Sequence, residues 1–270
     1  MKRFKLVFLV IAILIIQIGS PVFSEEILDK PTNKIPVLTY HHILPREDIT
    51  KYNWSNNSAV ISFEEFKEQM DFLYNNGFYT ATLDELQDFL NGKIQLPKKT
   101  VVITFDDGYL SNAIYAYPIM QQYNFRGTIF VIGSVANKEQ LIFEPSTLQF
   151  ISTNEMDKYT DVFDFECHTY DLHRMDKNHK PMLVSSGRKI IIDDLTKNKN
   201  LLNADYFAYP YGYYNRITIS YLKESGYKMA FTTKNGYVTK FSNRYELPRF
   251  SVTPYMQIER LMEISLGNNL

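Results

Sequence analysis

Short apolar runs alternate with amphipathic segments along most of this chain. Runs rich in β-branched and aromatic residues, bounded by charged residues, Pro or Gly, are typical of buried strands. Because helical patterns separate most of these runs, the sheet that they form is expected to be mainly parallel. We expect strands at residues 35–40, 101–105, 128–132, 163–167, 206–209, 229–232 and 250–252.

Capping signals predict where several helices begin. Ser62 with Glu65 has the spacing of a capping box, Thr82 with Glu85 repeats it, and Gly77 has the position of a stop signal for the first helix. Further helices are expected at residues 112–123, 186–202 and 217–225 and after residue 254. Residues 45–60 and 138–162 carry no regular pattern and are expected to be loops.

The predicted elements favour an α/β fold: a single domain built as an incomplete or distorted (β/α) barrel with about seven strands. A length of 270 residues with 45% hydrophobic composition suits one domain with a full core. No Gly-x-Gly-x-x-Gly follows any predicted strand, so a dinucleotide-binding sheet has no support.

The N-terminus has the pattern of an export signal. Basic residues precede an apolar run at residues 6–18, and small residues follow up to Ser24. The run is shorter than the roughly 20 residues that span a membrane. We therefore expect a signal peptide at residues 1–24, with an N-terminal anchor as the alternative, then a linker at 25–34 and the domain at 35–270. The protein is expected to be secreted, extracellular or associated with the cell surface.

Charge and cysteine content each exclude a class of function. The formal net charge is −1, whereas nucleic-acid binding needs a basic surface, so no nucleic-acid partner is expected. Cys167 is the single cysteine, which rules out an internal disulfide and a cysteine-rich zinc site. Any metal would have to be held by histidine and carboxylate side chains.

Candidate chemical groups lie just after the predicted strands. Asp106 and Asp107 leave the central strand as adjacent carboxylates, which are costly to bury unless a cation or a proton transfer uses them. His168 follows a later strand, and His173 lies five residues on, a spacing that fits a loop rather than one helical face. Two histidines and one carboxylate are a common ligand set for a catalytic metal. An ordinary turn and surface histidines are the alternatives for each motif alone.

Two further motifs supply groups that amide hydrolysis would need. Pro210, Tyr211 and Gly212 form a rigid turn after a strand, able to aim a backbone N–H at an oxyanion. A plain β-turn is the alternative. One histidine of the pair His41-His42 is the candidate general acid, since histidine donates protons near neutral pH. The tyrosines around Tyr211 are candidates for lining a sugar-binding groove.

Together the motifs resemble those of the NodB-homology polysaccharide deacetylases, the family-four carbohydrate esterases. The string Thr-Phe-Asp-Asp-Gly at 104–108, the histidine pair and the Pro-Tyr-Gly turn carry the resemblance, which extends over residues 35–253. Within the family, the chain is most similar to the poly-β-1,6-N-acetyl-D-glucosamine N-deacetylases of the intercellular-adhesion type. The five-residue histidine spacing, the early Tyr40-His41 and a third motif without arginine point there.

The resemblance implies a metal and a base beside it. Asp107, His168 and His173 would hold a divalent metal ion; zinc suits these ligands best, and cobalt, nickel or iron are alternatives. Asp106 would be the general base. The backbone N–H of Tyr211, in its turn with Pro210 and Gly212, would bind the oxyanion.

The resemblance also implies which residues of this chain replace the family's general acid and its base-orienting arginine, both of which are missing from their usual motifs. His41 would be the general acid, in the place that other members fill from a C-terminal Leu-x-His motif; the chain has no histidine after His179. The arginine that usually orients the base is missing from the third motif. Arg249 is the candidate to replace it, and Arg126 is the alternative.

The implied activity is metal-dependent removal of acetyl groups from N-acetylglucosamine units of an extracellular polysaccharide, in a biofilm matrix that serves cell adhesion. The polymer would be the partner, and membrane or cell-surface association is a further expectation. A deacetylase of peptidoglycan or chitin-like chains is the nearer alternative. A non-catalytic polysaccharide-binding protein is the alternative from another class.

Overall fold

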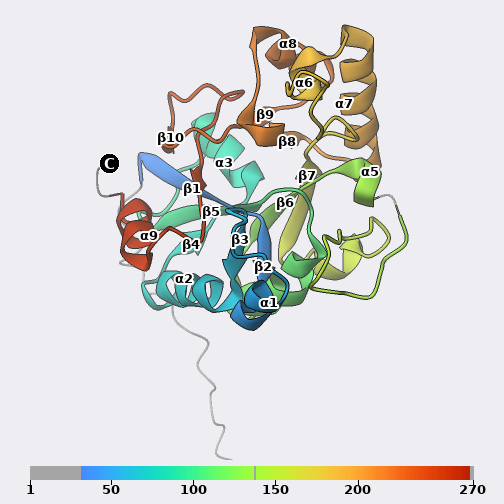
Figure 1. The fold of residues 1–270 in the computed structure, drawn as a ribbon. Coiled ribbons are helices and arrows are strands. Elements are labelled where there is room, and N and C mark those ends of the chain that lie inside the picture. Colours follow the sequence, from blue (N-terminus) through green and yellow to red (C-terminus); the bar gives the residue numbers. More distant parts are fainter. Residues whose placement is uncertain (1–31, 137, 268–270) are drawn as a thin grey trace, which may run out of the picture.

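One large sheet forms the centre of the molecule in the computed structural model, which describes residues 32–136 and 138–267 (Figure 1). Every strand pair along it is parallel except the pair of β10 with β1. The sheet is curled and open, so the predicted incomplete (β/α) barrel in a single domain is confirmed. The strand order is β10 (Tyr237–Thr239), β1 (Lys34–Tyr40), β5 (Thr100–Phe105), β6 (Gly127–Val131), β7 (Phe163–Cys167), β8 (Tyr206–Ala208) and β9 (Met229–Phe231), with β11 (Phe250–Ser251) paired to β1 and β4 (Tyr79–Thr80) to β5.

Helices surround this sheet, with α2 beside α9 and α7 beside α8 (Figure 1). Both predicted capping boxes are present, at Ser62 with Glu65 and at Thr82 with Glu85. The helices are α1 (Arg46–Lys51), α2 (Phe63–Asn75), α3 (Leu83–Leu90), α4 (Tyr117–Gln122), α5 (Gly133–Ala136), α6 (Met182–Ser185), α7 (Arg188–Leu202), α8 (Arg216–Glu224) and α9 (Ile258–Ser265), with a π-helical turn η2 (Asn112–Ala116) and 3-10 turns η3 (Met156–Tyr159) and η4 (Pro210–Gly212).

A small second sheet differs from the sequence prediction. β2 (His42–Leu44) pairs in parallel with β3 (Val60–Ser62), and α1 lies between them in the segment predicted to be a loop. α1 buries no residue and begins after Pro45 without a side-chain cap, so it has neither the apolar periodicity nor the capping signal that reveals a helix. The consequence for the site is that His41 lies in the short connection between β1 and β2.

The central strand β5 is buried on both faces. Val101, Ile103 and Phe105 pack into one hydrophobic cluster and Val102 into another, as the alternation of side chains along a strand requires. Strands of parallel sheets covered on both faces have this pattern. The residues that follow β5 therefore extend from a strand whose two faces are both packed against hydrophobic side chains.

The described part of the chain contains no helix that is both long and apolar enough to cross a membrane. The predicted signal at residues 1–24 lies outside the described residues, and so does the predicted linker up to residue 31. Residues 138–162 are largely irregular, as expected, apart from η3.

Candidate metal centre and catalytic groups

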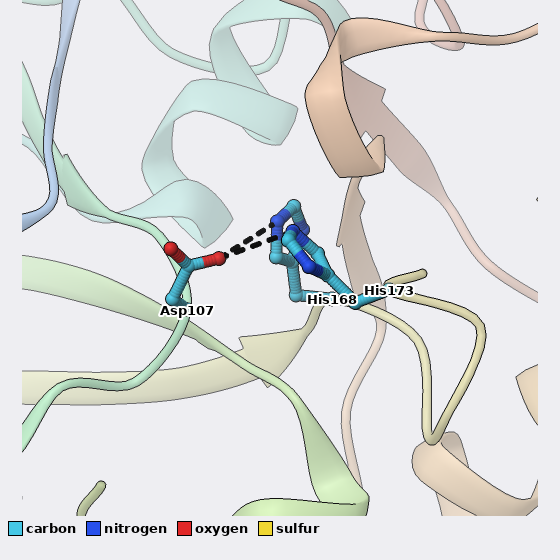
Figure 2. A group of neighbouring side chains, drawn as sticks. All are labelled: Asp107, His168 and His173. Carbon is cyan, nitrogen blue, oxygen red and sulfur yellow. Dashed lines mark ion pairs between the residues drawn. The ribbon is translucent and has the colours of Figure 1, made fainter. Parts of the chain in front are cut away.

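The three predicted metal ligands meet at the carboxyl ends of the strands. Asp107 follows β5 and His168 follows β7, with β6 between these strands. Oδ1 of Asp107 lies 3.4 Å from Nε2 of His168 and 3.2 Å from Nε2 of His173 (Figure 2). One ligand atom from each residue lies within 4.8 Å of the other two. The structure thus brings together a carboxylate and two imidazoles that are distant in sequence.

The donors fit a divalent cation. Oδ1 of Asp107 is buried and accepts no hydrogen bond from the described residues, a costly state for a carboxylate oxygen that a cation would relieve. Nδ1 of His168 lies 2.8 Å from the carbonyl oxygen of Ala208. Since a carbonyl can only accept, Nδ1 carries the proton, and a neutral ring then presents the lone pair of Nε2 toward Asp107.

The pKa shifts of Asp107 and His173 agree with this ligand set, whereas at His168 burial would lower the pKa but the carboxylates of Asp107 and Asp106 raise it. Burial alone would raise the pKa of Asp107, but His168, His41 and His173 hold it well below its ordinary value. Burial, reinforced by His168, lowers the pKa of His173 to about 4. The side chains are therefore an anionic carboxylate and, at His173, a neutral imidazole near neutral pH, the forms that bind metal ions.

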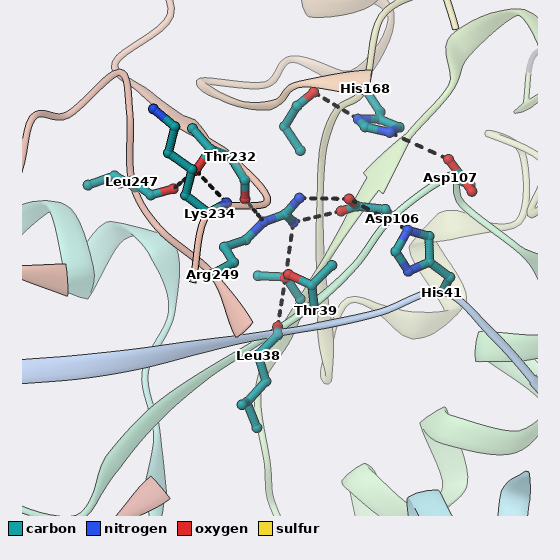
Figure 3. Close-up of polar contacts among 12 residues, drawn as sticks. Leu38, Thr39, His41, Asp106, Asp107, His168, Thr232, Lys234, Leu247 and Arg249 are labelled. Atoms are coloured by element: carbon teal, nitrogen blue, oxygen red, sulfur yellow. Dashed lines mark hydrogen bonds and ion pairs between the residues drawn. The ribbon is translucent and has the colours of Figure 1, made fainter. Parts of the chain in front are cut away.

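Asp106 forms an ion pair with a buried arginine. Nη1 and Nη2 of Arg249 each donate a 2.7 Å hydrogen bond to one oxygen of Asp106, and Nε donates to the carbonyl oxygen of Thr232 (Figure 3). Burial alone would raise the pKa of Asp106, but Arg249 holds it below its ordinary value. Arg126, the alternative from sequence, instead pairs with Asp164. The structure places Arg249, and not Arg126, against the candidate base.

Arg249→Met is expected to lower the free energy of unfolding by about 3–5 kcal/mol, because it leaves the carboxylate of Asp106 buried without its partner. Arg126→Met is the matched control: its pair with Asp164 is 32% and 41% exposed, and such pairs contribute about 0–1 kcal/mol. Urea unfolding monitored by circular dichroism measures both. Equal losses in the two variants would contradict this account of Arg249.

His41 is the member of the His41-His42 pair that faces the carboxylates. Its Nε2 lies 4.0 Å from Oδ2 of Asp106, and its side chain is 26% exposed (Figure 3). His42 is buried, with Nδ1 2.7 Å from the hydroxyl of Ser111, and burial lowers its pKa to about 4. The structure therefore brings His41 to the site and packs His42 away from solvent.

The Pro-Tyr-Gly turn lies against the histidine pair. Tyr211 and Gly212 both have left-handed φ values, 57° and 71°. A Cβ on Gly212 would come within 2.0 Å of the hydroxyl oxygen of Thr233, so this position requires glycine. The Tyr211 ring centroid lies 4.5 Å from that of His173, and its hydroxyl donates to the carbonyl oxygen of His173. The predicted turn is thus present beside the candidate metal centre.

Sequence reasoning missed Tyr109, two residues after Asp107. Its ring is nearly buried and lies 5.0 Å from that of His42. Burial, and then the nearby carboxylate of Asp107, raise the pKa of Tyr109, so it stays a neutral phenol close to the carboxylate. The chain has 20 tyrosines. The position of Tyr109 directly after the Asp-Asp-Gly string is the feature of the sequence that could have marked it as a site residue.

A family model described as polysaccharide deacetylase matches residues 93–230. This span includes both aspartates, both candidate histidine ligands and the Tyr211 turn, whereas His41 and Arg249 lie outside it.

Curated relatives match over nearly the whole chain. Poly-β-1,6-N-acetyl-D-glucosamine N-deacetylase of Staphylococcus aureus strain MRSA252 is 30% identical, covering 94% of each chain. The protein of the same name from Staphylococcus epidermidis is 27% identical with the same coverage.

Solved structures share the fold. IcaB from Ammonifex degensii superposes with a TM-score of 0.73 at 28% identity, covering 87% of this chain and 98% of the other. The Streptococcus pyogenes deacetylase PplD, solved with acetate, gives 0.72 at 24% identity over 87% and 99%.

Proposed function

The chain belongs to the polysaccharide deacetylase family, and from this membership we propose that it is a metal-dependent N-deacetylase of poly-β-1,6-N-acetyl-D-glucosamine. Hydrolytic N-deacetylation of a polysaccharide follows from the family and its named relatives. The specific polymer is supported by the curated relatives that bear its name and match 94% of the chain. The observation that carries the proposal is the carboxylate pair after β5, in which Asp107 faces two imidazoles and Asp106 faces Arg249.

Asp107, His168 and His173 would hold the ion. When bound there, a divalent metal supplies Lewis-acid polarisation of the acetamide carbonyl and makes a nearby water more acidic. Three protein ligands leave coordination positions open, as catalytic sites require. Zinc suits the ligand set best, and cobalt, nickel and iron are the alternatives.

The protein's own side chains move the protons. Asp106, kept unprotonated by Arg249, accepts a proton from the water whose oxygen attacks the acetamide carbon. The backbone N–H of Tyr211 stabilises the negative charge that develops on the carbonyl oxygen, a contribution of about 3–4 kcal/mol for one such donor. His41 donates a proton to the nitrogen as the C–N bond breaks. The products are acetate and a glucosamine unit.

His41→Ala is expected to lower kcat by about 10²-fold, at the lower end for loss of a general acid, because solvent reaches this partly exposed position and can donate in its place. Metal content should stay at the wild-type level. His179→Ala, at an exposed position outside the candidate ligand set, is the control and should keep wild-type kcat. Near-normal turnover by His41→Ala would refute the acid role.

The proposed substrate is tested with defined oligomers. Acetate release from β-1,6-linked N-acetylglucosamine oligomers should exceed release from β-1,4-linked ones, measured with the zinc-loaded protein. Turnover confined to β-1,4-linked oligomers would favour the peptidoglycan or chitin-like alternative. Binding without turnover in the presence of zinc, cobalt, nickel or iron would favour a non-catalytic binding protein.

We also propose that the protein acts outside the cell, with residues 1–24 as signal peptide or anchor, 25–34 as linker and 35–270 as the deacetylase domain. The extracellular polymer is the partner, and association with the membrane or cell surface is part of this proposal. Each edited sugar gains an amine that is cationic near neutral pH. The product would therefore adhere to anionic surfaces, in keeping with a role in a biofilm matrix.

A further inference from the structure

The segment between the two candidate histidine ligands adopts an unfavourable backbone conformation. Thr169 is fully buried and has a φ of 68°, in the left-handed region that β-branched residues rarely adopt. Such conformations persist where the surroundings determine them, and they cluster at functional sites. His168 is fixed by its place at the end of β7 and by its bond to Ala208, whereas His173 lies beyond this strained segment.

On one side, α5 holds the carbonyl groups of the segment. The N–H of Gly133 donates to the oxygen of Thr169 at 3.1 Å, and the N–H of Ser134 donates to that of Tyr170 at 2.7 Å. A Cβ on Gly133 would lie 2.1 Å from Oδ1 of Asn198 and 2.8 Å from the Tyr170 ring. Glycine at 133 thus permits the close approach that these two hydrogen bonds need.

On the other side of this segment, a single carboxylate accepts hydrogen bonds from two of its backbone N–H groups. Oδ1 of Asp194, on α7, accepts from the N–H of Tyr170 at 2.8 Å, and Oδ2 accepts from the N–H of Asp171 at 2.7 Å. The Asp194 side chain is buried. Burial raises its pKa to about 6, while the two amides act to lower it. Because both oxygens of this buried carboxylate accept hydrogen bonds from the same loop, Asp194 restrains the backbone of that loop.

α7 is itself fixed to the sheet and to its neighbours. One turn after Asp194, the side-chain amide of Asn198 donates to the carbonyl oxygen of Val131 on β6 at 3.0 Å. The hydroxyl of Tyr227 donates to the carbonyl oxygen of Leu195 at 2.9 Å. Asp194 therefore transmits the position of a strand-anchored helix to the loop that carries His173.

We propose that Asp194 is a positioning residue, which sets the path of the 169–172 loop so that His173 completes the ligand set with Asp107 and His168. The inference rests on the proposed metal centre. Residues 169–172 form neither helix nor strand, so the hydrogen bonds to Asp194 supply a restraint that regular secondary structure does not.

Asp194→Asn tests this role with little change in shape. Asparagine keeps one acceptor oxygen but turns an N–H₂ group toward the second amide, so one clamp bond is lost. Zinc affinity measured by competition with a chelating dye should fall by about 10–100-fold, the usual effect of losing a group that orients a ligand. The visible absorption bands of the cobalt-loaded protein, which report ligand number and geometry, should shift.

Asp193→Asn is the matched control, since Asp193 is the neighbouring residue on α7, is exposed and pairs with Lys189. It should keep wild-type affinity and cobalt bands. Wild-type values for both quantities in Asp194→Asn, or an equal loss in Asp193→Asn, would overturn the inference.

Two further measurements separate the outcomes. If wild-type protein binds no zinc or cobalt, the proposed metal centre fails; if it binds and Asp194→Asn is unchanged, only the positioning role fails. Should Asp194→Asn not fold, Asp194→Glu replaces it, with both oxygens kept but displaced by one methylene. Shifted cobalt bands in Asp194→Glu then support the role, and unchanged bands with unchanged affinity overturn it.

Discussion

An Asp107→Ala variant is expected to lose its divalent metal and its acetate release together. The substitution removes the anionic member of the ligand set and leaves His168 and His173 without the carboxylate that both imidazoles face. The metal's contribution to the transition state is several kcal/mol, so kcat/KM should fall by roughly 10⁴-fold. Zinc stoichiometry by atomic absorption and acetate release by a coupled assay measure the two losses on one sample.

Asp193→Ala serves as the control for this experiment, because it removes an exposed carboxylate on α7 that pairs with Lys189. It should retain zinc and turnover. Normal turnover by metal-free Asp107→Ala would remove the basis for assigning these residues to a metal. Full zinc binding with no turnover would instead assign Asp107 a role in proton transfer.

Asp106→Asn is expected to lower kcat by about 10³–10⁴-fold while zinc stays bound at wild-type stoichiometry. Asparagine has nearly the same shape as aspartate but cannot accept the proton of the attacking water. The neighbouring Asp107 and its two histidines keep their arrangement, because Asp106 is held from the side of Arg249 rather than by the metal ligands. The expected signature is thus loss of turnover without loss of metal.

Comparing Asp107→Ala with Asp106→Asn tests whether Asp107 holds the metal and Asp106 accepts the proton. A thermal unfolding scan of Asp106→Asn checks that the unpaired guanidinium of Arg249 has not unfolded the protein. If both variants lose zinc, Asp106 is a ligand and not the base. If Asp106→Asn turns over at the wild-type rate, the proton acceptor lies elsewhere in the site.

The parts of the fold that could be predicted from sequence are those fixed by local patterns. β5 is buried on both faces and reads as a continuous apolar run, and the capping boxes of α2 and α3 need only residues three apart. For the same reason, Asp106, Asp107 and His168 could be placed at strand ends. α1 could not be predicted, because it buries no side chain and lacks a side-chain cap.

The partners of the site residues depend on contacts between distant segments. Arg249 lies 143 positions from Asp106, and it reaches the carboxylate because β11 pairs with β1, the neighbour of β5. The sequence named Arg249 as the candidate and left Arg126 as the alternative, because the pairing partner of either arginine depends on the fold. Asp194 likewise resembles any charged residue of an exposed helix until the loop that it holds is seen.

The hydrogen bonds of Arg249 also have a consequence for when the site can form. Its guanidinium joins Asp106 and Thr104 at β5 to the carbonyl of Thr232, just after the edge strand β9. Because the chain is synthesised from its N-terminus and a domain generally folds as a unit, the Asp-Asp string is made long before its counter-charge. A chain that ends before Arg249 would keep the candidate metal ligands yet lack the cation that keeps Asp106 ionised. Deacetylation would therefore begin only after the C-terminal segment with β11 has paired with β1. Activity would thus be confined to chains that have folded completely.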